Sequence, residues 1–185
     1  PFLELFLCWY VRLGRKPGEI RILFDVDDAI YRGPQGEKSR IQEWKIRTIA
    51  SAVDTVIVGN AHLAQFFTES SVEIIPTTVS MVSYPIAAPR NGEYPLRIGW
   101  SGVESNLGYL HRLAEPLSDL MARTPFRMIV ISNPGAHFTL SSEIPLELRP
   151  WSAHRERILL SDIDVGLMPL SDDAWSAGKC GLKII

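Results

Sequence analysis

Cysteine and histidine are scarce in this sequence. Its 185 residues include 2 cysteines, Cys8 and Cys180, and 4 histidines. Two cysteines so far apart are too few for a disulfide framework or a zinc site, and the spacings of a Ser-His-Asp triad or a metalloprotease are missing. These absences favour a protein of the reducing cytoplasm.

An excess of charge of one sign is also missing. The chain has 19 Lys and Arg against 21 Asp and Glu, for a net charge of -2 and a pI near 6.1. Such a balance gives no general attraction to nucleic acid. Hydrophobic residues make up 46% and charged residues 22% of the chain, which is typical of a globular protein and not of a disordered one.

Long hydrophobic runs are absent as well. The N-terminal segment 1–16, PFLELFLCWYVRLGRK, contains Glu4, and its apolar stretch of about ten residues is well short of the roughly 20 that cross a bilayer. No basic region precedes it, so a signal peptide is not indicated. We expect a buried or interfacial helix. Arg12, Arg15 and Lys16 would suit a helix C-terminus, or peripheral contact with the inner membrane face.

What the chain does contain is an alternation of short apolar runs and helical stretches. The pattern predicts strands at 21–25, 55–58, 72–75, 96–100, 127–131, 146–149 and 164–168. It predicts helices at 38–53, 60–68, 105–123, 153–161 and from about 177 onward. Repetition of strand and helix indicates an α/β fold with parallel sheets.

A proline-rich stretch interrupts this alternation. Residues 76–95 carry four prolines and show no sustained periodicity, which is unusual inside one compact domain and natural between two. We therefore predict a first domain at 1–80, a linker at 81–95 and a second domain at 96–185.

The first chemically suggestive stretch is RILFDVDDAIYRG, residues 21–33. A hydrophobic run delivers Asp25, Asp27 and Asp28 together. Three interpretations are open: the nucleophile loop of a phosphatase, a metal-binding Asp-x-Asp, or a strand end whose carboxylates cap the next helix.

The phosphatase interpretation rests on a resemblance. FDVDDAIYRG resembles the first motif of the haloacid-dehalogenase superfamily, which would make Asp25 the nucleophile and Asp27 the general acid of a magnesium-dependent phosphatase. Ala29 departs from the motif. The other site residues would be Ser132 and Asn133, Lys179 or Lys183, and the pair Asp172 and Asp173.

The second half carries a different resemblance. LRIGWSGVESNLGYL and DVGLMPLSDDAWSAGKCGLKII resemble the bacterial GT-B glycosyltransferases of the group-1 (GT4-like) type. DVDDAIY, AVDTVIVGNAHLAQFF and VEIIPTTVS resemble the end of the N-terminal domain of those enzymes. The resemblance covers residues 21–185. It implies parts of two Rossmann-like domains with parallel sheets, an acceptor-side domain followed by a donor-side domain.

The same resemblance implies an activity. Such enzymes transfer a sugar from a nucleotide-sugar donor to a cell-envelope or polysaccharide acceptor, which is a saccharide or a lipid-linked molecule. It implies retention of anomeric configuration and no metal or cofactor, since the nucleotide-sugar is a substrate. Asp25, Asp27 and Asp28 would then face the cleft between the domains.

Candidate donor-binding residues lie in three places. Gly99, Ser101 and Gly102 are predicted to form a tight turn, with the N–H groups of a helix from about Ser105 aimed at it as an anion site. Relatives carry Arg and Lys on this turn, where this chain has Val103, Glu104 and Asn106. Lys179 and Lys183, four apart on the predicted last helix, are the nearest replacements. The remaining candidates are Cys180, Gly181 and Leu182 for sugar hydroxyls and Trp151 and Ser152 for the base.

The chain is also expected to be part of a larger enzyme. The family's Glu-x7-Glu motif would place its first Glu at Gly178 and its second beyond Ile185. We therefore expect exposed sheet edges, self-association and no catalysis by this chain alone. A non-catalytic α/β interaction module is the remaining alternative.

Overall fold

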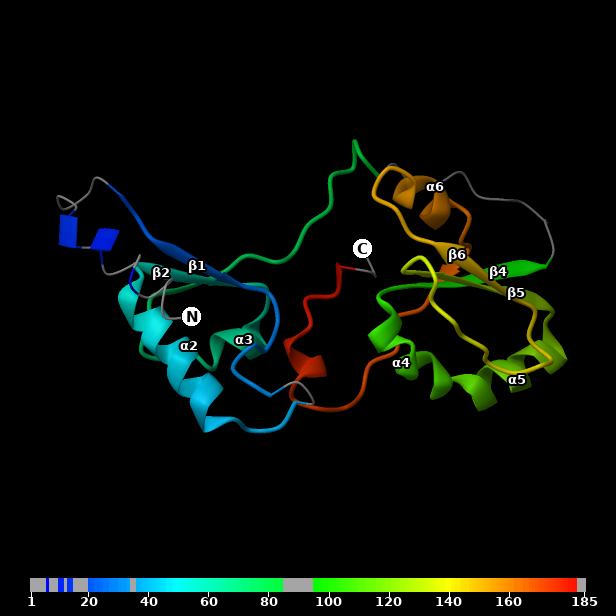
Figure 1. The fold of residues 1–185 in the computed structure, drawn as a ribbon, viewed down its shortest axis with the longest axis horizontal. Helices are drawn as coiled ribbons and strands as arrows, with labels where there is room; N and C mark the ends of the chain where they lie inside the picture. The colour runs from blue at the N-terminus through cyan, green and yellow to red at the C-terminus, as the bar shows by residue number, and fades with distance from the viewer. Residues whose placement is uncertain are drawn as a thin grey trace. The chain divides into compact units, whose positions relative to one another are not determined.

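The computed structural model describes residues 6, 10–11, 13–14, 20–33, 36–84 and 95–182. The chain is an α/β protein with two parallel sheets, as predicted. It divides into two compact units (Figure 1), which we call unit 1 (Pro1–Thr78 with Asp172–Gly181) and unit 2 (Val79–Ser171 with Leu182–Ile185). The predicted domains had placed 172–181 with the second half of the chain.

The sheet of unit 1 has three parallel strands in the order β1-β2-β3. They are β1 (Leu23–Val26), β2 (Thr55–Val58) and β3 (Val72–Ile74). Helix α2 (Arg40–Ala52) connects β1 to β2, and α3 (Ala61–Ala64) lies between β2 and β3. Parallel neighbours need crossover connections of this kind, because a two-residue turn cannot return the chain to the same end of the sheet.

One face of this sheet forms the core of unit 1. Val26, Val56 and Val58 pack there with Leu63 and Phe67, and all five side chains are buried. Each fully buried side chain of this kind contributes about 1.5–3 kcal/mol. Because side chains alternate along a strand, residues next to a core residue in the sequence point to the opposite face of the sheet.

The helices of unit 1 begin at polar caps. The Ser39 hydroxyl accepts a hydrogen bond from the N–H of Gln42 at the start of α2, over 3.4 Å. The Asn60 side-chain oxygen accepts one from the N–H of Leu63 at the start of α3, over 2.9 Å. Helix α3 is shorter than predicted, because the N–H of Phe66 bonds to the carbonyl three residues back instead of four.

Unit 2 contains four parallel strands in the order β6-β5-β4-β7. They are β4 (Leu96–Ser101), β5 (Phe126–Ser132), β6 (Leu146–Pro150) and β7 (Val165–Gly166). From β4 the chain adds β5 and β6 on one side and then returns to add β7 on the other. The order therefore reverses at β4, and doubly wound sheets bind ligands beyond the carboxyl ends of strands at such a reversal.

The predicted helix 105–123 is divided into three pieces. These are the 3₁₀ turn η1 (Glu104–Asn106), α4 (Gly108–His111) and α5 (Ala114–Arg123), while α6 (Glu156–Ser161) precedes β7. Pro116 explains the last break, since proline has no N–H to donate to the preceding turn and is tolerated only near a helix start. Leu113 leaves the helical conformation, with φ -95° and ψ 2°, and α5 begins after it.

Strand β5 is buried on both faces, as is typical of a central strand in a parallel sheet. Met128 and Val130 pack with Trp100 of β4 in one cluster. Ile129 and Ile131 pack with Leu159 of α6 on the opposite face, with further partly buried neighbours. In Figure 1, α4 and α5 lie on one side of this sheet and α6 lies on the other.

The N-terminal segment is only partly described. Residues 6, 10, 11, 13 and 14 are helical, and the side chains of Phe6, Tyr10 and Leu13 are 67%, 69% and 73% exposed. The described residues are helical, as predicted; these three side chains are not buried, and the interfacial alternative stays a prediction. Arg12, Arg15, Lys16, Lys183 and most of 81–95 lie outside the described residues.

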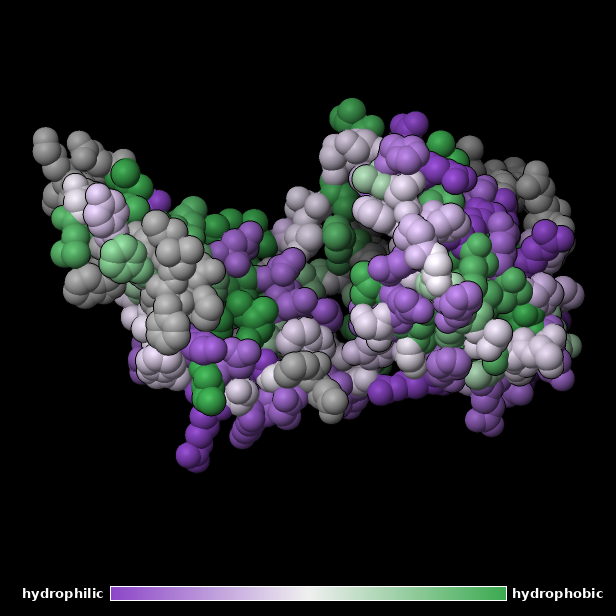
Figure 2. Space-filling view, viewed as in Figure 1, coloured by the Kyte–Doolittle hydropathy of each residue, from purple (hydrophilic) through white to green (hydrophobic). Residues whose placement is uncertain are grey.

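Surface composition agrees with the mixed sequence. Figure 2 shows hydrophobic and hydrophilic residues interspersed over the face that it draws. Among the described residues, no helix combines the length and the apolar character needed to cross a membrane.

Gly99 of β4 generates a stability prediction. A Cβ added there would lie 2.2 Å from Cδ1 and 2.4 Å from Cγ1 of Ile163. We expect Gly99→Ala to lower the free energy of unfolding by about 1–3 kcal/mol, because the added methyl group would overpack the space that Ile163 fills. Urea denaturation measures this, and Gly99→Ala combined with Ile163→Ala should shift the stability less than the sum of the two single changes.

Gly108 supplies the matched control. A Cβ there meets nothing within 4 Å, so Gly108→Ala should leave stability unchanged or raise it by up to about 1 kcal/mol, since alanine favours the helix. Equal midpoints for Gly99→Ala and Gly108→Ala would contradict the packing role of Gly99.

Candidate functional site

The carboxyl ends of the three strands of unit 1 meet at one edge of its sheet. Asp27 and Asp28 follow β1, Gly59 and Asn60 follow β2, and Thr77 lies beyond β3. Residues 172–181 pack on this unit, and we call Asp172–Gly181 the return segment. The edge at which parallel sheets bind ligands is therefore in contact with a later part of the chain.

An ion pair joins the return segment to this edge. Lys179 Nζ lies 2.9 Å from Oδ1 and 3.0 Å from Oδ2 of Asp28. The two side chains are 26% and 34% exposed, so solvent screens the pair and its contribution is about 0–1 kcal/mol. The same ammonium lies 5.2 Å from the ring centroid of Trp175, a cation–π contact worth about 0.5–1 kcal/mol.

Asn60 holds the backbone that carries Lys179. Its Nδ2 donates to the carbonyl oxygens of Gly178 at 3.2 Å and Lys179 at 3.3 Å, while its Oδ1 caps α3. One side-chain amide therefore ties a helix start to the return segment. Asn60 was not among the predicted site residues, although an asparagine directly after a predicted strand and before a helix is a recognisable cap signal.

Cys180 packs beside the ends of β1 and β2. Its thiol donates to the carbonyl oxygen of Asp27 over 2.9 Å, and a Cβ at Gly59 would lie 2.2 Å from its sulfur. Burial raises the pKa of the Cys180 thiol, against the opposing effect of hydrogen bonds with Thr77 and Asn60. Folding therefore favours the neutral thiol, the less nucleophilic form.

The rest of the return segment is held by packing. Trp175 packs against the core of unit 1, and a Cβ at Gly178 would lie 2.8 Å from Cβ of Ala29. Asp173 Oδ1 accepts a hydrogen bond from the N–H of Ser176 over 2.7 Å, at the start of the single 3₁₀ turn η2 (Ser176–Gly178).

The predicted helix from about 177 onward is wrong for the described residues. After η2 the backbone is extended at Lys179, with φ -66° and ψ 135°, and Gly181 has φ 71°. Asn60 donates to the carbonyls of Gly178 and Lys179, which a continuing helix would need as acceptors. Lys179 therefore does not lie on the predicted helix face, and Lys183 lies outside the described residues.

The Asp25 side chain does not join those of Asp27 and Asp28. Asp25 lies within β1 and next to the buried Val26, so its carboxylate points to the opposite face of the sheet. Asp27 contributes its carbonyl oxygen, and Asp28 contributes its carboxylate to the ion pair. Among the described residues, no group of three or more His, Cys, Asp or Glu side chains is arranged to hold a metal ion.

In unit 2, Ser101 and Gly102 lie at the carboxyl end of β4, where the strand order reverses. Gly99 lies inside β4 and not in the turn as predicted, because its lack of a Cβ admits Ile163. The Gly102 N–H donates to the Ile131 carbonyl oxygen over 3.0 Å. The Glu104 N–H donates to Asn133 Oδ1 over 2.9 Å, so both amides already have acceptors.

The phosphatase residues are distributed over two sheets. Ser132 ends β5 of unit 2 and Asn133 follows it, whereas Asp25 lies in β1 of unit 1 and Asp27 follows it. Ser132 is 1% exposed and its hydroxyl has no hydrogen-bond partner in the structure. The phosphatase motif needs these groups on strand ends of one sheet, which is not the arrangement here.

Trp151 follows β6 with its ring 42% exposed. Its indole Nε1–H donates to Glu156 Oε1 over 3.0 Å, and the Tyr84 hydroxyl donates to Glu156 Oε2 over 2.6 Å. The orientation of the indole is therefore set by a carboxylate that a second aromatic residue also holds. No sequence signal marked Glu156 or Tyr84. Ser152, the other predicted base-binding residue, has a buried hydroxyl with no partner in the structure.

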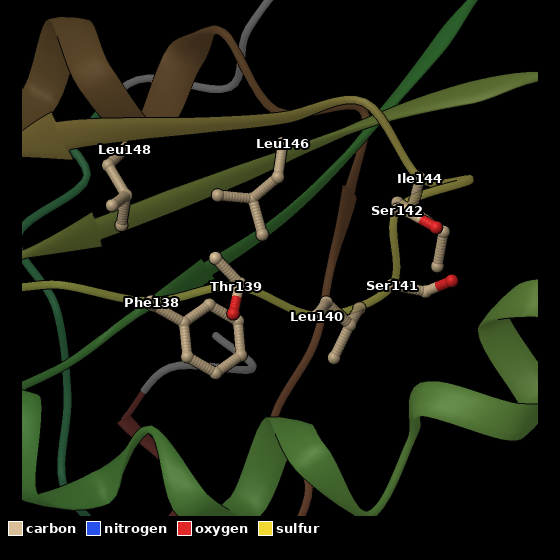
Figure 3. Close-up of a pocket in the computed structure, with 8 residues that line it drawn as sticks. All are labelled: Phe138, Thr139, Leu140, Ser141, Ser142, Ile144, Leu146 and Leu148. Atoms are coloured by element: carbon tan, nitrogen blue, oxygen red, sulfur yellow. The ribbon is translucent and has the colours of Figure 1, made fainter.

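A pocket of about 580 Å³ lies elsewhere on unit 2. Figure 3 shows Leu146 and Leu148 of β6 directed towards the loop after β5, which carries Phe138 and Leu140. The rest of the lining is Thr139, Ser141, Ser142 and Ile144. No predicted site residue lines it.

Two groups of predicted residues are thus brought together. Asp27, Asp28, Lys179 and Cys180 meet in unit 1, and Ser101 and Gly102 lie at the strand reversal of unit 2. Comparison with known protein families and with curated proteins finds neither a family model nor a relative that matches this chain.

Cys180 allows a direct check of the unit 1 contacts. In a Cys8→Ser protein, we expect alkylation of Cys180 by iodoacetamide at pH 8 to be slower than in urea, because burial raises the pKa of the thiol. The raised pKa of the thiol also makes folding depend on pH. Its contribution to the free energy of unfolding is fully present at low pH and is lost as the pH rises through the folded-state pKa. Equal alkylation rates in the folded and unfolded chain would contradict these contacts.

The Glu156 contacts give a second check. The hydrogen bond to Glu156 raises the pKa of Tyr84, because ionising the phenol removes the proton that it donates to the carboxylate. We expect Glu156→Gln to return the pKa of Tyr84 towards its ordinary value, measured by NMR titration. A Glu147→Gln protein is the control, and an identical Tyr84 titration in both variants would exclude the contact.

Proposed function

We propose that this protein is a glycosyltransferase of the GT-B type. It transfers a sugar from a nucleotide-sugar donor to a cell-envelope or polysaccharide acceptor. The observation that carries this proposal is the reversal of strand order at β4, with Ser101 and Gly102 directly at its carboxyl end. Doubly wound sheets bind nucleotides at such a point, and the glycine spacing of GWSG had already indicated an anion-binding turn there.

The base is assigned to the exposed ring of Trp151. A nucleobase stacks on an indole face, and the hydrogen bond from Nε1 to Glu156 over 3.0 Å limits rotation of the ring. Ser152 is the neighbouring candidate at the same strand end. A pre-oriented ring loses less rotational freedom on binding, which favours affinity.

Lys179 is assigned to the diphosphate. A positive charge at the leaving group stabilises the negative charge that develops as the glycosidic bond breaks. Cys180, Gly181 and Leu182 follow it, and their backbone is assigned to sugar hydroxyls. In this mechanism the Lys179 ammonium, and not a divalent ion, offsets the charge of the diphosphate.

The reaction proceeds with retention of configuration, as the resemblance implies. The bond from the sugar C1 to the diphosphate oxygen breaks, and an acceptor hydroxyl oxygen forms the new bond to C1 on the same face. The acceptor proton passes to the released diphosphate. The two reacting centres must be held about 3–3.5 Å apart for this to be efficient.

Nucleotide binding tests the proposal. We expect UDP- or GDP-sugars to bind in calorimetric titration with the same affinity in the presence and absence of EDTA. Lys179→Gln should weaken binding roughly 10- to 100-fold, since a hydrogen bond to a charged group contributes about 1.5–3 kcal/mol. Lys45→Gln on α2 is the matched control and should bind like the unmodified chain.

Two results would overturn this assignment. Phosphate-ester hydrolysis that both EDTA and Asp25→Asn abolish would identify a phosphatase. Absence of binding by every nucleotide tested would favour a non-catalytic interaction module.

A further inference from the structure

The cation assigned to the diphosphate has a carboxylate partner within its own unit. Both oxygens of Asp28 lie within 3.0 Å of Lys179 Nζ, so an anionic ligand and this carboxylate would compete for one ammonium group. An ammonium is a compact charge with three donors. A ligand that binds the Lys179 ammonium must replace the electrostatic contribution of Asp28.

The ammonium can change partner without release of the segment that carries it. Lys179 is anchored through its backbone by Asn60, and the segment is packed through Trp175 and Gly178. The ion pair joins side chains that are 26% and 34% exposed, and it contributes about 0–1 kcal/mol. A dianionic group outcompetes a single carboxylate at this energy, because it carries twice the charge.

We propose that Asp28 is an internal competitor that neutralises Lys179 until a diphosphate takes its place, and that Asn60 is the residue that positions Lys179 for this exchange. The identity of the diphosphate as part of a nucleotide-sugar rests on the proposed function. The exchange lowers the affinity of the site for monoanions, because a single negative charge gains little over the carboxylate already present. It therefore selects for di- and polyphosphate groups.

Asp28→Asn is the direct test, because it removes the charge and keeps the side-chain shape. We expect inorganic diphosphate to bind the variant about two- to fivefold more tightly, as expected for loss of a screened ion pair. Asp27→Asn is the control, since Asp27 contacts the return segment through its carbonyl oxygen, and it should change the affinity less. The same comparison in a Lys179→Gln background should show no gain from Asp28→Asn.

Asn60→Ser tests the positioning role. Serine can still cap α3, but it cannot donate to the carbonyls of Gly178 and Lys179 as the Asn60 amide does. We expect weaker diphosphate binding with an unfolding midpoint close to that of the unmodified chain. Fluorescence of Trp175, whose ring centroid lies 5.2 Å from the ammonium, should change on diphosphate binding, and Trp175→Phe removes the signal.

The outcomes separate this inference from the proposed function. Equal or weaker diphosphate binding by Asp28→Asn, with nucleotide binding that depends on Lys179, overturns the competitor and leaves the glycosyltransferase. Tighter diphosphate binding by Asp28→Asn, with no preference for UDP or GDP over diphosphate, supports the competitor and overturns the glycosyltransferase. If neither diphosphate nor any nucleotide binds to the unmodified protein or to Asp28→Asn, the competitor role and the glycosyltransferase assignment are both overturned.

Discussion

The side-chain amide of Asn60 is the interaction on which the candidate site in unit 1 depends. Its oxygen caps α3 and its nitrogen donates to two carbonyls of the return segment. A capping oxygen contributes about 0.5–2 kcal/mol to helix stability, so the orientation of the amide is constrained by the helix. That orientation then decides where η2 ends and where Lys179 begins to extend.

The contacts around Lys179 differ in strength and in how far they depend on charge. Packing of Trp175 and the close approach of Gly178 to Ala29 do not depend on charge or salt. The ion pair with Asp28 is only partly buried, so it depends on charge and is screened by salt. The backbone is therefore held firmly while the ammonium is held weakly, which suits a group that exchanges one anion for another.

Unit 2 depends on a different constraint, the position of β4 between β5 and β7. Gly99 allows Ile163 to reach the strand, and the Leu167 N–H donates to the Gly99 carbonyl oxygen over 2.8 Å. These contacts hold the segment around β7 against β4. Glycine at this position is thus explained by strand and loop packing, whereas Ser101 ends the strand and the turn begins with Gly102.

The sequence by itself determined the strands and the fold class, because short apolar runs and their alternation with helical stretches are local properties. The last break in helix 105–123 has a local signal in Pro116, whereas the packing of residues 172–181 on unit 1 has none. Lys179 was recognised from a motif, but its carboxylate partner Asp28 and its positioning by Asn60 join residues more than a hundred positions apart. Such contacts depend on how parallel strands bring their carboxyl ends to one edge, and only the tertiary structure decides which side chains meet there.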